Sequence, residues 1–333
     1  MAIEAVAYAR AGLIGNPSDG YHGKTISFII RNFSAKVSFY DNHEVEIVPS
    51  VRDRSAYPTV RELVRDVSDY GYYGAIRIVK ATIKKFVEYC DANGHSLPDR
   101  NFSARYRTSI PRHVGLAGSS ALVTATLRCL MDFYEIRIPN EHQPGVILSV
   151  ETDELGIAAG LQDRVIQVYE GCVFMDFDRA YMENTGHGRY EELRPSSLPN
   201  LYIAYRTRLA EGSEVFHNNI RQRWDDGDQQ VIDAMSEFAS LAQQARDAIE
   251  SGHTEDLGPL MDRNFDLRRT LFRLSDANID LVERARSVGA SAKFAGSGGA
   301  IVGVYDDEKM FRKLQEAFKG TQTNVIRPDI APA

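Results

Sequence analysis

The spacing of apolar residues along the chain predicts both helices and strands. In residues 73–91, apolar side chains recur at steps of three and four, which places them on one face of a helix. They are Ile76, Val79, Ile83, Phe86, Val87 and Cys90. The remaining pattern predicts helices at about residues 229–250, 256–274, 277–287 and 307–318, and a short one at 59–68. On the first of these, one apolar stripe is predicted, which consists of Val231, Met235, Phe238, Ala242, Ala245 and Ile249.

Strands are predicted where β-branched and aromatic residues dominate. The segment TISFIIRNFSAKVSFY after Lys24 indicates two strands, and FSARYRTSI, GCVFMDF, LYIAYRT and NVIRP indicate one each. Because strands and helices alternate irregularly, the pattern favours an α+β fold over a doubly wound parallel sheet. The length of 333 residues is typical of two domains. Residues 179–200 are rich in Gly, Glu, Asn and Pro, so we predict domains of residues 1–197 and 198–333.

The composition disfavours several classes of protein. The apolar fraction of 43% and the charged fraction of 26% are ordinary globular values. The net charge of −7 provides no basic field for nucleic acid or an anionic membrane. The chain contains no apolar run long enough to span a membrane, and MAIEAVAYAR does not have the pattern of a signal peptide. Three cysteines in mostly apolar contexts indicate buried free thiols and a cytoplasmic protein.

The stretch GLIGNPSDGYHGKT, residues 12–25, ends like a phosphate-binding P-loop. That motif requires a glycine where this chain has Ser18. It also requires a helix after Lys24, where the pattern predicts a strand. The sequence therefore disfavours a P-loop, and the stretch needs another explanation.

The segment PRHVGLAGSSALVTATL runs from a glycine-rich loop into an apolar helix. Gly115 and Gly118 permit positive φ and close approach of the backbone, and Ser119 and Ser120 fall at the N-cap or in the first turn. The free N–H groups and the dipole of such a helix attract phosphate, and serine hydroxyls suit Mg²⁺. An ordinary turn that caps a buried helix explains this segment about equally well.

Carboxylates gather in the segment VETDELGIAAGLQDRV. Glu151 and Glu154 are three residues apart and share a face if the segment is helical, and Asp163 follows in a loop-like context. One carboxylate for a metal and another for a hydroxyl proton are what a phosphoryl transferase requires. A solvated acidic helix face is the alternative, and for the segment alone it is the commoner one.

A third glycine-rich segment, KFAGSGGAIVGV, follows near the C-terminus. Lys293 and Phe294 end a strand, residues 296–299 form a tight turn, and an apolar strand leaves it. Another segment can pass very close to such a turn, although a glycine-rich hairpin also accounts for it.

Taken together and in this order, these segments resemble the GHMP kinases, the superfamily of galactokinase, homoserine kinase, mevalonate kinase and phosphomevalonate kinase. ARAGLIGNPSD resembles the first superfamily motif, with Arg10 at its basic position and Asp19 at the sugar-binding aspartate position of the galactokinase type. PRHVGLAGSSA resembles the ATP-phosphate motif, and KFAGSGGA resembles the third motif, with Ser297 where an alanine is usual. The extra residue in GLAGSSA, and GLQD, which ends at Asp163, resemble the sugar-1-kinase branch and, within it, the glucuronokinases.

The resemblance implies the two-domain α+β fold of the GHMP kinases, with an N-terminal domain like ribosomal protein S5 domain 2 and a ferredoxin-like C-terminal domain. It implies ATP as co-substrate and Mg²⁺ as cofactor. Asp163 is expected to accept or orient the proton of the sugar hydroxyl, with Arg10 beside it. The implied ATP-binding residues are Pro111, Gly115, Leu116, Ala117, Gly118, Ser119, Ser120 and Ala121. The implied metal ligands are Ser119, Ser120 and a glutamate, where Glu154 fits the ELG match better than Glu151.

The implied reaction is phosphorylation of D-glucuronate at its anomeric hydroxyl. A kinase of a fucose, heptose or galactose type, or a non-catalytic sensor of ATP and sugar, is the alternative. The expected substrate-binding residues are Asn16, Ser18, Asp19, Lys24, Gln162, Gly296, Ser297 and Gly298. Lys24 is the first candidate to bind a substrate carboxylate, followed by Arg206, Arg208, Arg221 and Arg223, and His22 and His217 could bind hydroxyls. The protein is expected to act as a monomer or homodimer without nucleic acid or membrane.

Overall fold

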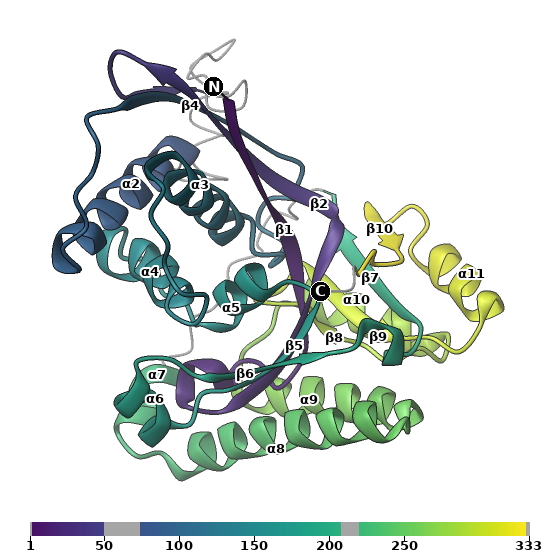
Figure 1. The fold of residues 1–333 in the computed structure, drawn as a ribbon. Coiled ribbons are helices and arrows are strands. Elements are labelled where there is room, and N and C mark those ends of the chain that lie inside the picture. Colours follow the sequence, from purple (N-terminus) through teal and green to yellow (C-terminus); the bar gives the residue numbers. More distant parts are fainter. Residues whose placement is uncertain (1, 50–73, 208–219, 331–333) are drawn as a thin grey trace. The chain divides into compact units, whose positions relative to one another are not determined.

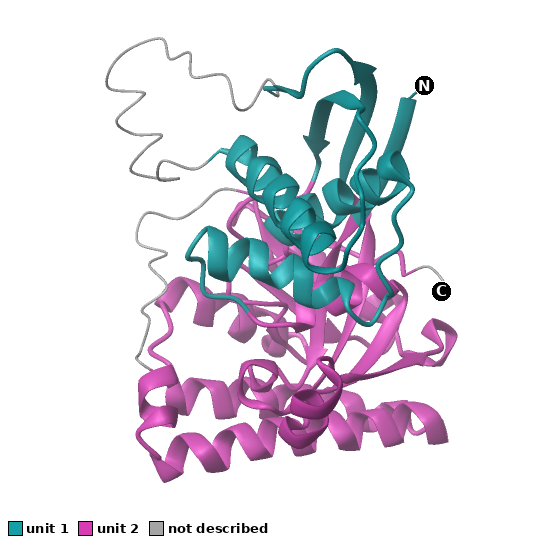
Figure 2. Ribbon diagram, turned by 60° about the vertical axis from the view of Figure 1, so that its left-hand side comes forward, with its two compact units in different colours: residues 1–7, 34–109, 118–159 teal, residues 8–33, 110–117, 160–333 magenta. Residues whose placement is uncertain are grey.

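The computed structural model describes residues 2–49, 74–207 and 220–330, which form two compact units (Figure 2). Unit 1 comprises residues 1–7, 34–109 and 118–159, and unit 2 comprises residues 8–33, 110–117 and 160–333. The helix predicted at 59–68, Arg208 and His217 lie outside the described residues. The domain boundary at 197/198 stays a prediction.

Unit 1 combines helices with short strands. Its helices are α2 (Ala75–Ala92), α3 (Gly118–Tyr134) and α4 (Gln143–Ser149), and α4 runs directly into a π-helical turn at Val150–Glu154 (Figure 1). Helix α2 packs against α3 and buries Val79, Phe86 and Cys90 of the predicted stripe. Strand β3 (Glu46–Val48) is parallel to β4 (Asn101–Thr108), which pairs antiparallel with residues 35–42 of strand β2.

Unit 2 contains an antiparallel sheet in the order β10–β7–β9–β8. These strands are β7 (Leu201–Arg206), β8 (Lys293–Phe294), β9 (Ala300–Val304) and β10 (Thr323–Ile326). Helices α9 (Leu257–Leu271) and α10 (Asp276–Ser287) precede β8, and α11 (Glu308–Ala317) lies between β9 and β10. The order of elements and the central position of the first and third strands confirm the predicted ferredoxin-like arrangement.

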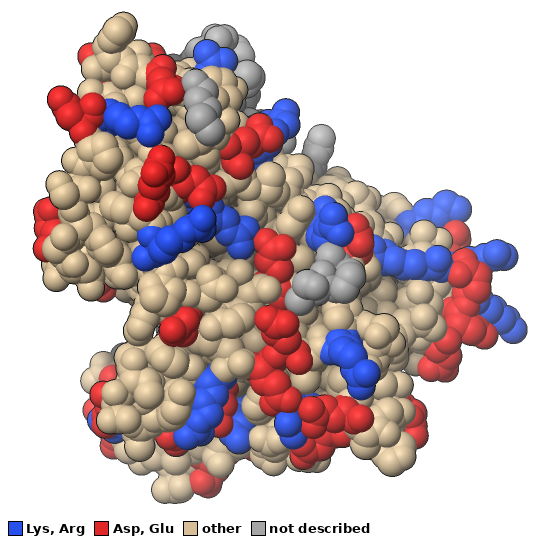
Figure 3. Space-filling model, viewed as in Figure 1, with Lys and Arg blue, Asp and Glu red and all other residues tan. Residues whose placement is uncertain are grey.

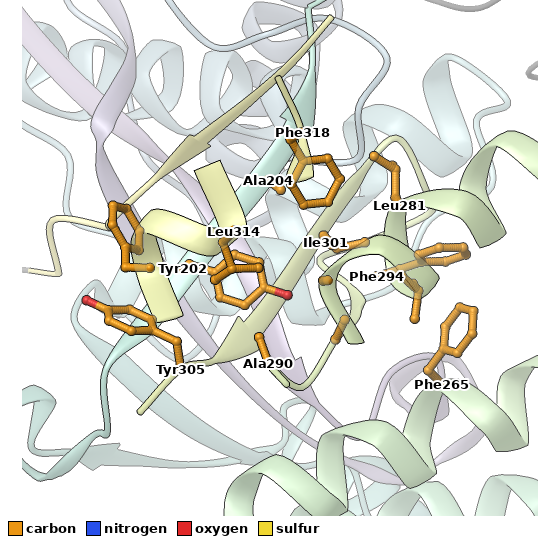
Figure 4. Packing of buried hydrophobic residues seen from close by; sticks show 14 residues of the cluster. Tyr202, Ala204, Phe265, Leu281, Ala290, Phe294, Ile301, Tyr305, Leu314 and Phe318 are labelled. Atoms are coloured by element: carbon orange, nitrogen blue, oxygen red, sulfur yellow. The ribbon is translucent and has the colours of Figure 1, made fainter. Parts of the chain in front are cut away.

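Aromatic and aliphatic side chains from this sheet and its helices form one buried cluster. Figure 4 shows Tyr202 of β7, Phe265 of α9, Leu281 of α10, Phe294 of β8 and Phe318 after α11 in it. Phe294 is 1% exposed, so the cluster fixes the end of β8, directly before the glycine turn. Burial of apolar surface therefore holds the turn in place from one side.

The other elements of unit 2 include helix α8 (Gln229–Ser251), which lies along α9 (Figure 1). Its predicted stripe is buried throughout: Val231, Met235, Phe238, Ala242, Ala245 and Ile249. The rest are α5 (Gln162–Tyr169), β5 (Cys172–Asp176), α6 (Arg179–Thr185), β6 (Arg189–Leu193) and α7 (Ile220–Asp225). Strand β6 pairs antiparallel with β5 and lies inside residues 179–200, where the sequence predicted no strand because RYEEL is too polar to indicate one.

The prediction of two strands after Lys24 was wrong. The structure has one strand, β2 (Lys24–Asn42), which pairs with β1 (Ala2–Ile14). The polar residues Arg31 and Asn32 are exposed within this strand. They were interpreted as a break between two strands, but the segment has no Gly or Pro that would turn the chain there. Residues 24–28 pair with β5 in unit 2, and residues 35–42 pair with β4 in unit 1.

The charged side chains of the surface and the state of the cysteines are as the sequence led us to expect. Acidic and basic side chains are interspersed on the face shown in Figure 3. No helix of the described part of the chain has the length and apolar character needed to cross a membrane. Cys90, Cys129 and Cys172 are buried and unbonded, and burial raises the pKa of Cys129 and of Cys172 to about 12, so neither is a reactive thiolate.

Candidate active site

Arg10 and Asp163 form a bidentate ion pair in unit 2. Arg10 Nε donates to Asp163 Oδ1 at 2.6 Å, and Nη2 donates to Oδ2 at 2.8 Å. Arg10 is 5% exposed. Because a planar guanidinium matches both oxygens of a carboxylate, the pair fixes the orientation of both side chains. The two residues predicted to be catalytic are therefore in direct contact.

Asp163 lies in the first turn of α5 and not in a loop as expected. The glycines that suggested a loop precede the helix, and Val165 and Ile166 hold the helix in a buried cluster with Val173 and Met175 of β5. Burial by itself raises the pKa of Asp163, but Arg10 and Arg164 outweigh it and keep the pKa below its usual value. The carboxylate is therefore ionised at neutral pH.

Arg10 also brings two glycine-rich loops together. Its Nη1 donates to Gly115 O at 2.7 Å and to Ala295 O at 3.0 Å. A Cβ on Gly115 would lie 2.9 Å from Gly298 O, and a Cβ on Gly296 would collide with Gly115 O. The segment that passes close to the turn at 296–299 is therefore the loop around Gly115, and both positions require glycine.

The loop of residues 110–117 leads directly into the first turn of α3, as predicted. Gly115 has φ 68° and Ala117 has φ 59°, whereas Gly118, predicted to permit positive φ, already belongs to the helix. Gln167 Nε2 donates to Ala117 O and to Tyr8 O, at 3.0 Å each, which holds the end of the loop against β1. In the same loop, Leu116 is buried and Pro111 is partly exposed.

The loop that follows β1 contains a short 3₁₀ helix at Ser18–Tyr21. Ser18 is fully buried, and its Oγ donates to Lys24 O at 2.9 Å, so its hydroxyl shapes the loop. Asn264 of α9 accepts from Gly15 N at 2.7 Å and donates to Asn16 O at 3.2 Å. Strand β2 then begins at Lys24, which confirms that this stretch is not a P-loop.

Asp19 in this loop lies against the start of α5. Its Oδ2 accepts from Gln162 N at 3.4 Å, and a Cβ on Gly160 would collide with its carboxylate. Burial raises the pKa of Asp19 to about 6, and the negative charge of Asp163 acts in the same direction. The two carboxylates therefore lie close enough to repel each other, which strains the protein when both are ionised.

We expect Asp19→Asn to stabilise the protein at neutral pH. The folded protein holds the Asp19 proton more tightly than the unfolded chain, so this residue's contribution to stability falls as pH rises from about 4 to about 6. At pH 7 the substitution should raise the free energy of unfolding by about 1–2 kcal/mol, allowing for partial exposure. Urea unfolding at pH 7 and at pH 4 measures the difference, which should nearly vanish at pH 4.

The glutamates that were expected to share a face have separate partners in unit 1. Ser119 Oγ donates to Glu151 Oε1 at 2.6 Å, and Glu151 is 1% exposed. Glu154, for which the sequence match was better, forms an ion pair with Lys84 of α2. The π-helical turn separates the two side chains, so only Glu151 meets the serine motif.

Ser119 and Glu151 are suited to Mg²⁺, which prefers hard oxygen ligands. Ser119 is exposed, whereas Ser120 is fully buried in the same first turn, followed by the buried Ala121. The described residues contain no cluster of three or more His, Cys, Asp or Glu that could hold a metal. A magnesium site at Ser119 and Glu151 would therefore leave several positions to water or nucleotide oxygens, which is usual for this ion.

The remaining predicted substrate residues differ in their surroundings. Lys24 Nζ donates to Gln243 at 2.9 Å and lies 3.6 Å from Asp176, so its charge is already paired. Ser297 is exposed, and Gly298 is buried with φ 140°. Asn16 Oδ1 and Gln162 Oε1 are buried acceptors without a hydrogen-bond partner in the described residues, so a hydroxyl-rich ligand could satisfy them.

Three polar residues that interact with residues 12–19 were not predicted as site residues: Asn264, Arg268 and Lys293. Lys293 is 1% exposed and donates to Gly12 O at 2.7 Å and to Phe294 O at 2.8 Å. Arg268 follows Asn264 by one helical turn, on a stripe that also holds Met261 and Leu271. Asn264 and Arg268 occupy positions of α9 where the spacing predicts apolar residues. Polar residues at such positions were the sequence signal that could have identified them as candidate site residues.

The fold and these motifs are those of a known class of enzymes. The family model described as GHMP kinases N terminal domain matches residues 77–171, and the one described as GHMP kinases C terminal matches residues 245–320. The crystal structure of Lactococcus lactis galactokinase complexed with galactose has a TM-score of 0.75 and 14% identity, covering 100% of this chain and 94% of that one. The chain belongs to the GHMP kinases.

Two curated relatives narrow this class. Glucuronokinase 1 of Arabidopsis thaliana is 45% identical over 90% of this chain and 84% of its own length. Probable glucuronokinase 2 of the same plant is 45% identical over 89% of this chain and 82% of its own length. Within the GHMP kinases, this chain is a member of the glucuronokinase family, and it is a sugar kinase.

Proposed function

We propose that the protein transfers the γ-phosphoryl group of ATP to the anomeric hydroxyl of D-glucuronate, giving D-glucuronate 1-phosphate and ADP. The observation that carries the proposal is the bidentate Arg10–Asp163 pair, which lies where the two glycine-rich loops meet and beside Asp19. The choice of glucuronate rests on the 45% identity to the glucuronokinases.

In the proposed reaction, Asp163 binds the attacking hydroxyl and accepts its proton. Each oxygen that accepts from Arg10 retains a lone pair for this task, and the carboxylate is ionised at neutral pH. The new bond forms between the sugar oxygen and the γ-phosphorus as the bond from that phosphorus to ADP breaks. Arg10 stabilises the charge on the transferring group, since phosphoryl transfer depends mainly on positioning and electrostatics.

Residues 111–121 would bind the triphosphate of ATP. The left-handed residues Gly115 and Ala117 turn the chain into the N-terminus of α3, whose free N–H groups favour anions. Ser119 and Glu151 would hold Mg²⁺, which neutralises phosphate charge when it is bound. Asp19, Asn16 and Gln162 would bind sugar hydroxyls, because their oxygens lie at the loop beside Asp163.

A panel of substrates tests the proposal. ADP release should be fastest with D-glucuronate, compared with D-galacturonate, D-glucose, D-galactose, L-fucose and a heptose. Phosphorus NMR of the product should show the phosphate attached to C1. No turnover with any uronic acid would rule out glucuronate as substrate, and turnover with a neutral sugar alone would favour a kinase of that sugar.

A further inference from the structure

Arg268 is a partly buried arginine without a hydrogen-bond acceptor among the described residues. Its Nε is buried and unpaired. Its guanidinium carbon lies 5.0 Å from the ring centroid of Phe272 and 5.4 Å from that of Phe294. The aromatic rings hold the planar group in place but leave its donors unused. Because an unpaired buried donor costs free energy, such a side chain is poised to gain an acceptor from a ligand.

Arg268 belongs to the same region of unit 2 as the loop of residues 15–23 between β1 and β2, here called the sugar loop because it carries the proposed sugar ligands Asn16 and Asp19. Asn264, one helical turn earlier on α9, binds Gly15 and Asn16 of that loop directly. Burial lowers the pKa of Arg268 to about 10, with the charge of Asp19 opposing this shift, so the two side chains are within electrostatic range. Arg268 therefore stays protonated at neutral pH, and its charge interacts with that of Asp19.

The balance of charge around Asp19 and Asp163 favours an anionic substrate. Arg10 and Arg164 both interact with these two carboxylates. Arg268 adds a further positive charge, whereas burial and the charges of Arg268 and Arg10 lower the pKa of Lys293 and favour its neutral form. A neutral sugar would leave Arg268 unpaired, whereas a sugar acid would bring the missing carboxylate.

Four of the five cations that the sequence suggested for this role have partners, and the fifth, Arg208, lies outside the described residues. Lys24 is paired with Asp176 and Gln243. Arg223 Nε donates to Asp228 at 2.7 Å, Arg221 donates to Gly20 O at 2.5 Å, and Arg206 donates to Ala277 O. A carboxylate at Lys24, Arg221 or Arg223 would have to break or share an existing bond. Arg206 also has an unpaired Nε, but its Nη2 is bound to Ala277 O, whereas Arg268 has no hydrogen bond within the described residues to give up.

We propose that Arg268 binds the carboxylate of the sugar acid and so sets the preference of the enzyme for a uronic acid over a neutral sugar. This inference rests on the proposed function, since it names the residue that recognises the acid group of that substrate. A guanidinium can donate two parallel hydrogen bonds to a carboxylate, which gives direction as well as attraction.

The test combines a change in the enzyme with a change in the ligand. Steady-state kinetics with D-glucuronate, and inhibition by its uncharged amide D-glucuronamide, are measured for the wild type, Arg268→Gln and Arg268→Lys. The wild type should prefer the acid by roughly 100-fold. In Arg268→Gln the KM for D-glucuronate should rise by about the same factor and the preference should disappear, while the KM for ATP stays within about twofold. For Arg268→Lys, the KM for D-glucuronate and the preference for the acid should lie between those of the wild type and Arg268→Gln. Lysine keeps the positive charge but cannot donate two parallel hydrogen bonds to a carboxylate.

The matched control is Arg269→Gln, because Arg269 is an exposed arginine next to Arg268 on α9. Its Nη1 lies 3.4 Å from Glu283 Oε1 of α10. This substitution should leave all these constants unchanged. Equal binding of acid and amide by the wild type, or an unchanged preference in either Arg268 variant, would overturn the proposal while phosphorylation of glucuronate stands. Absence of glucuronate turnover in the wild type would instead overturn the proposed function. Because the comparison of acid and amide uses the wild type, the proposal stays testable even if a variant folds poorly.

Discussion

Asp163→Asn should lower kcat by roughly 1,000-fold, within the range typical for loss of a general base. The amide can still accept one hydrogen bond from Arg10, but it cannot take up the proton of the sugar hydroxyl. Binding of ATP should change less than kcat, because Asp163 reaches residues 111–121 through Arg10, which keeps its own bond to Gly115 O. Single-turnover phosphorylation of glucuronate, with the KM for ATP measured in parallel, gives both quantities.

Loss of the ion pair must be separated from loss of the base. Removing one partner of a buried ion pair is destabilising by itself. The urea concentration at the unfolding midpoint of the variant is therefore measured at the assay temperature and at a lower one. Asp233→Asn, which neutralises an exposed carboxylate on α8, is the control and should have wild-type kcat. A folded Asp163→Asn enzyme with wild-type kcat would show that Asp163 is not the base.

Much of the fold could be predicted because burial follows the period of each element. The stripe on α8 is buried at every predicted position, and the strand and helix order of the C-terminal part was correct except for the short helix α7, which was not predicted. The failures have local causes. Arg31 and Asn32 interrupt the apolar pattern of β2 without turning the chain. Strand β6 is polar because only Leu193 of its five side chains is buried, while its backbone pairs with β5.

The sequence identified the motifs that form the candidate site, but it could not show which of their side chains contact one another. Arg10 and Asp163 are 153 positions apart, and only the folded chain shows that they form a bidentate pair. The sequence could not distinguish Glu151 from Glu154, because a π-helical turn changes which side chain meets Ser119. It also could not show that Lys24 is paired and Arg268 is not, since the partners come from other elements.

The two glutamates provide the second large prediction. Glu151→Gln should reduce activity by roughly 100-fold at low Mg²⁺ and should raise the Mg²⁺ concentration needed for half-maximal rate. Glu151 is buried against Ser119 and supplies the carboxylate of the proposed metal site, and an amide oxygen carries no net charge to attract the ion. Calorimetric titration of ATP into the enzyme with and without Mg²⁺ measures the same loss independently of turnover.

Glu154→Gln is the matched control, because it makes the same chemical change three residues away. Glu154 is bound to Lys84 on a partly exposed surface, so its loss should cost little stability and should leave the Mg²⁺ dependence of both rate and ATP binding at the wild-type value. If the effects were exchanged between the two variants, Glu154 would be the metal ligand and Glu151 would only orient Ser119. If both variants lost Mg²⁺-dependent binding equally, the π-helical turn would have to present both carboxylates to the ion, which its contacts in the structure do not support.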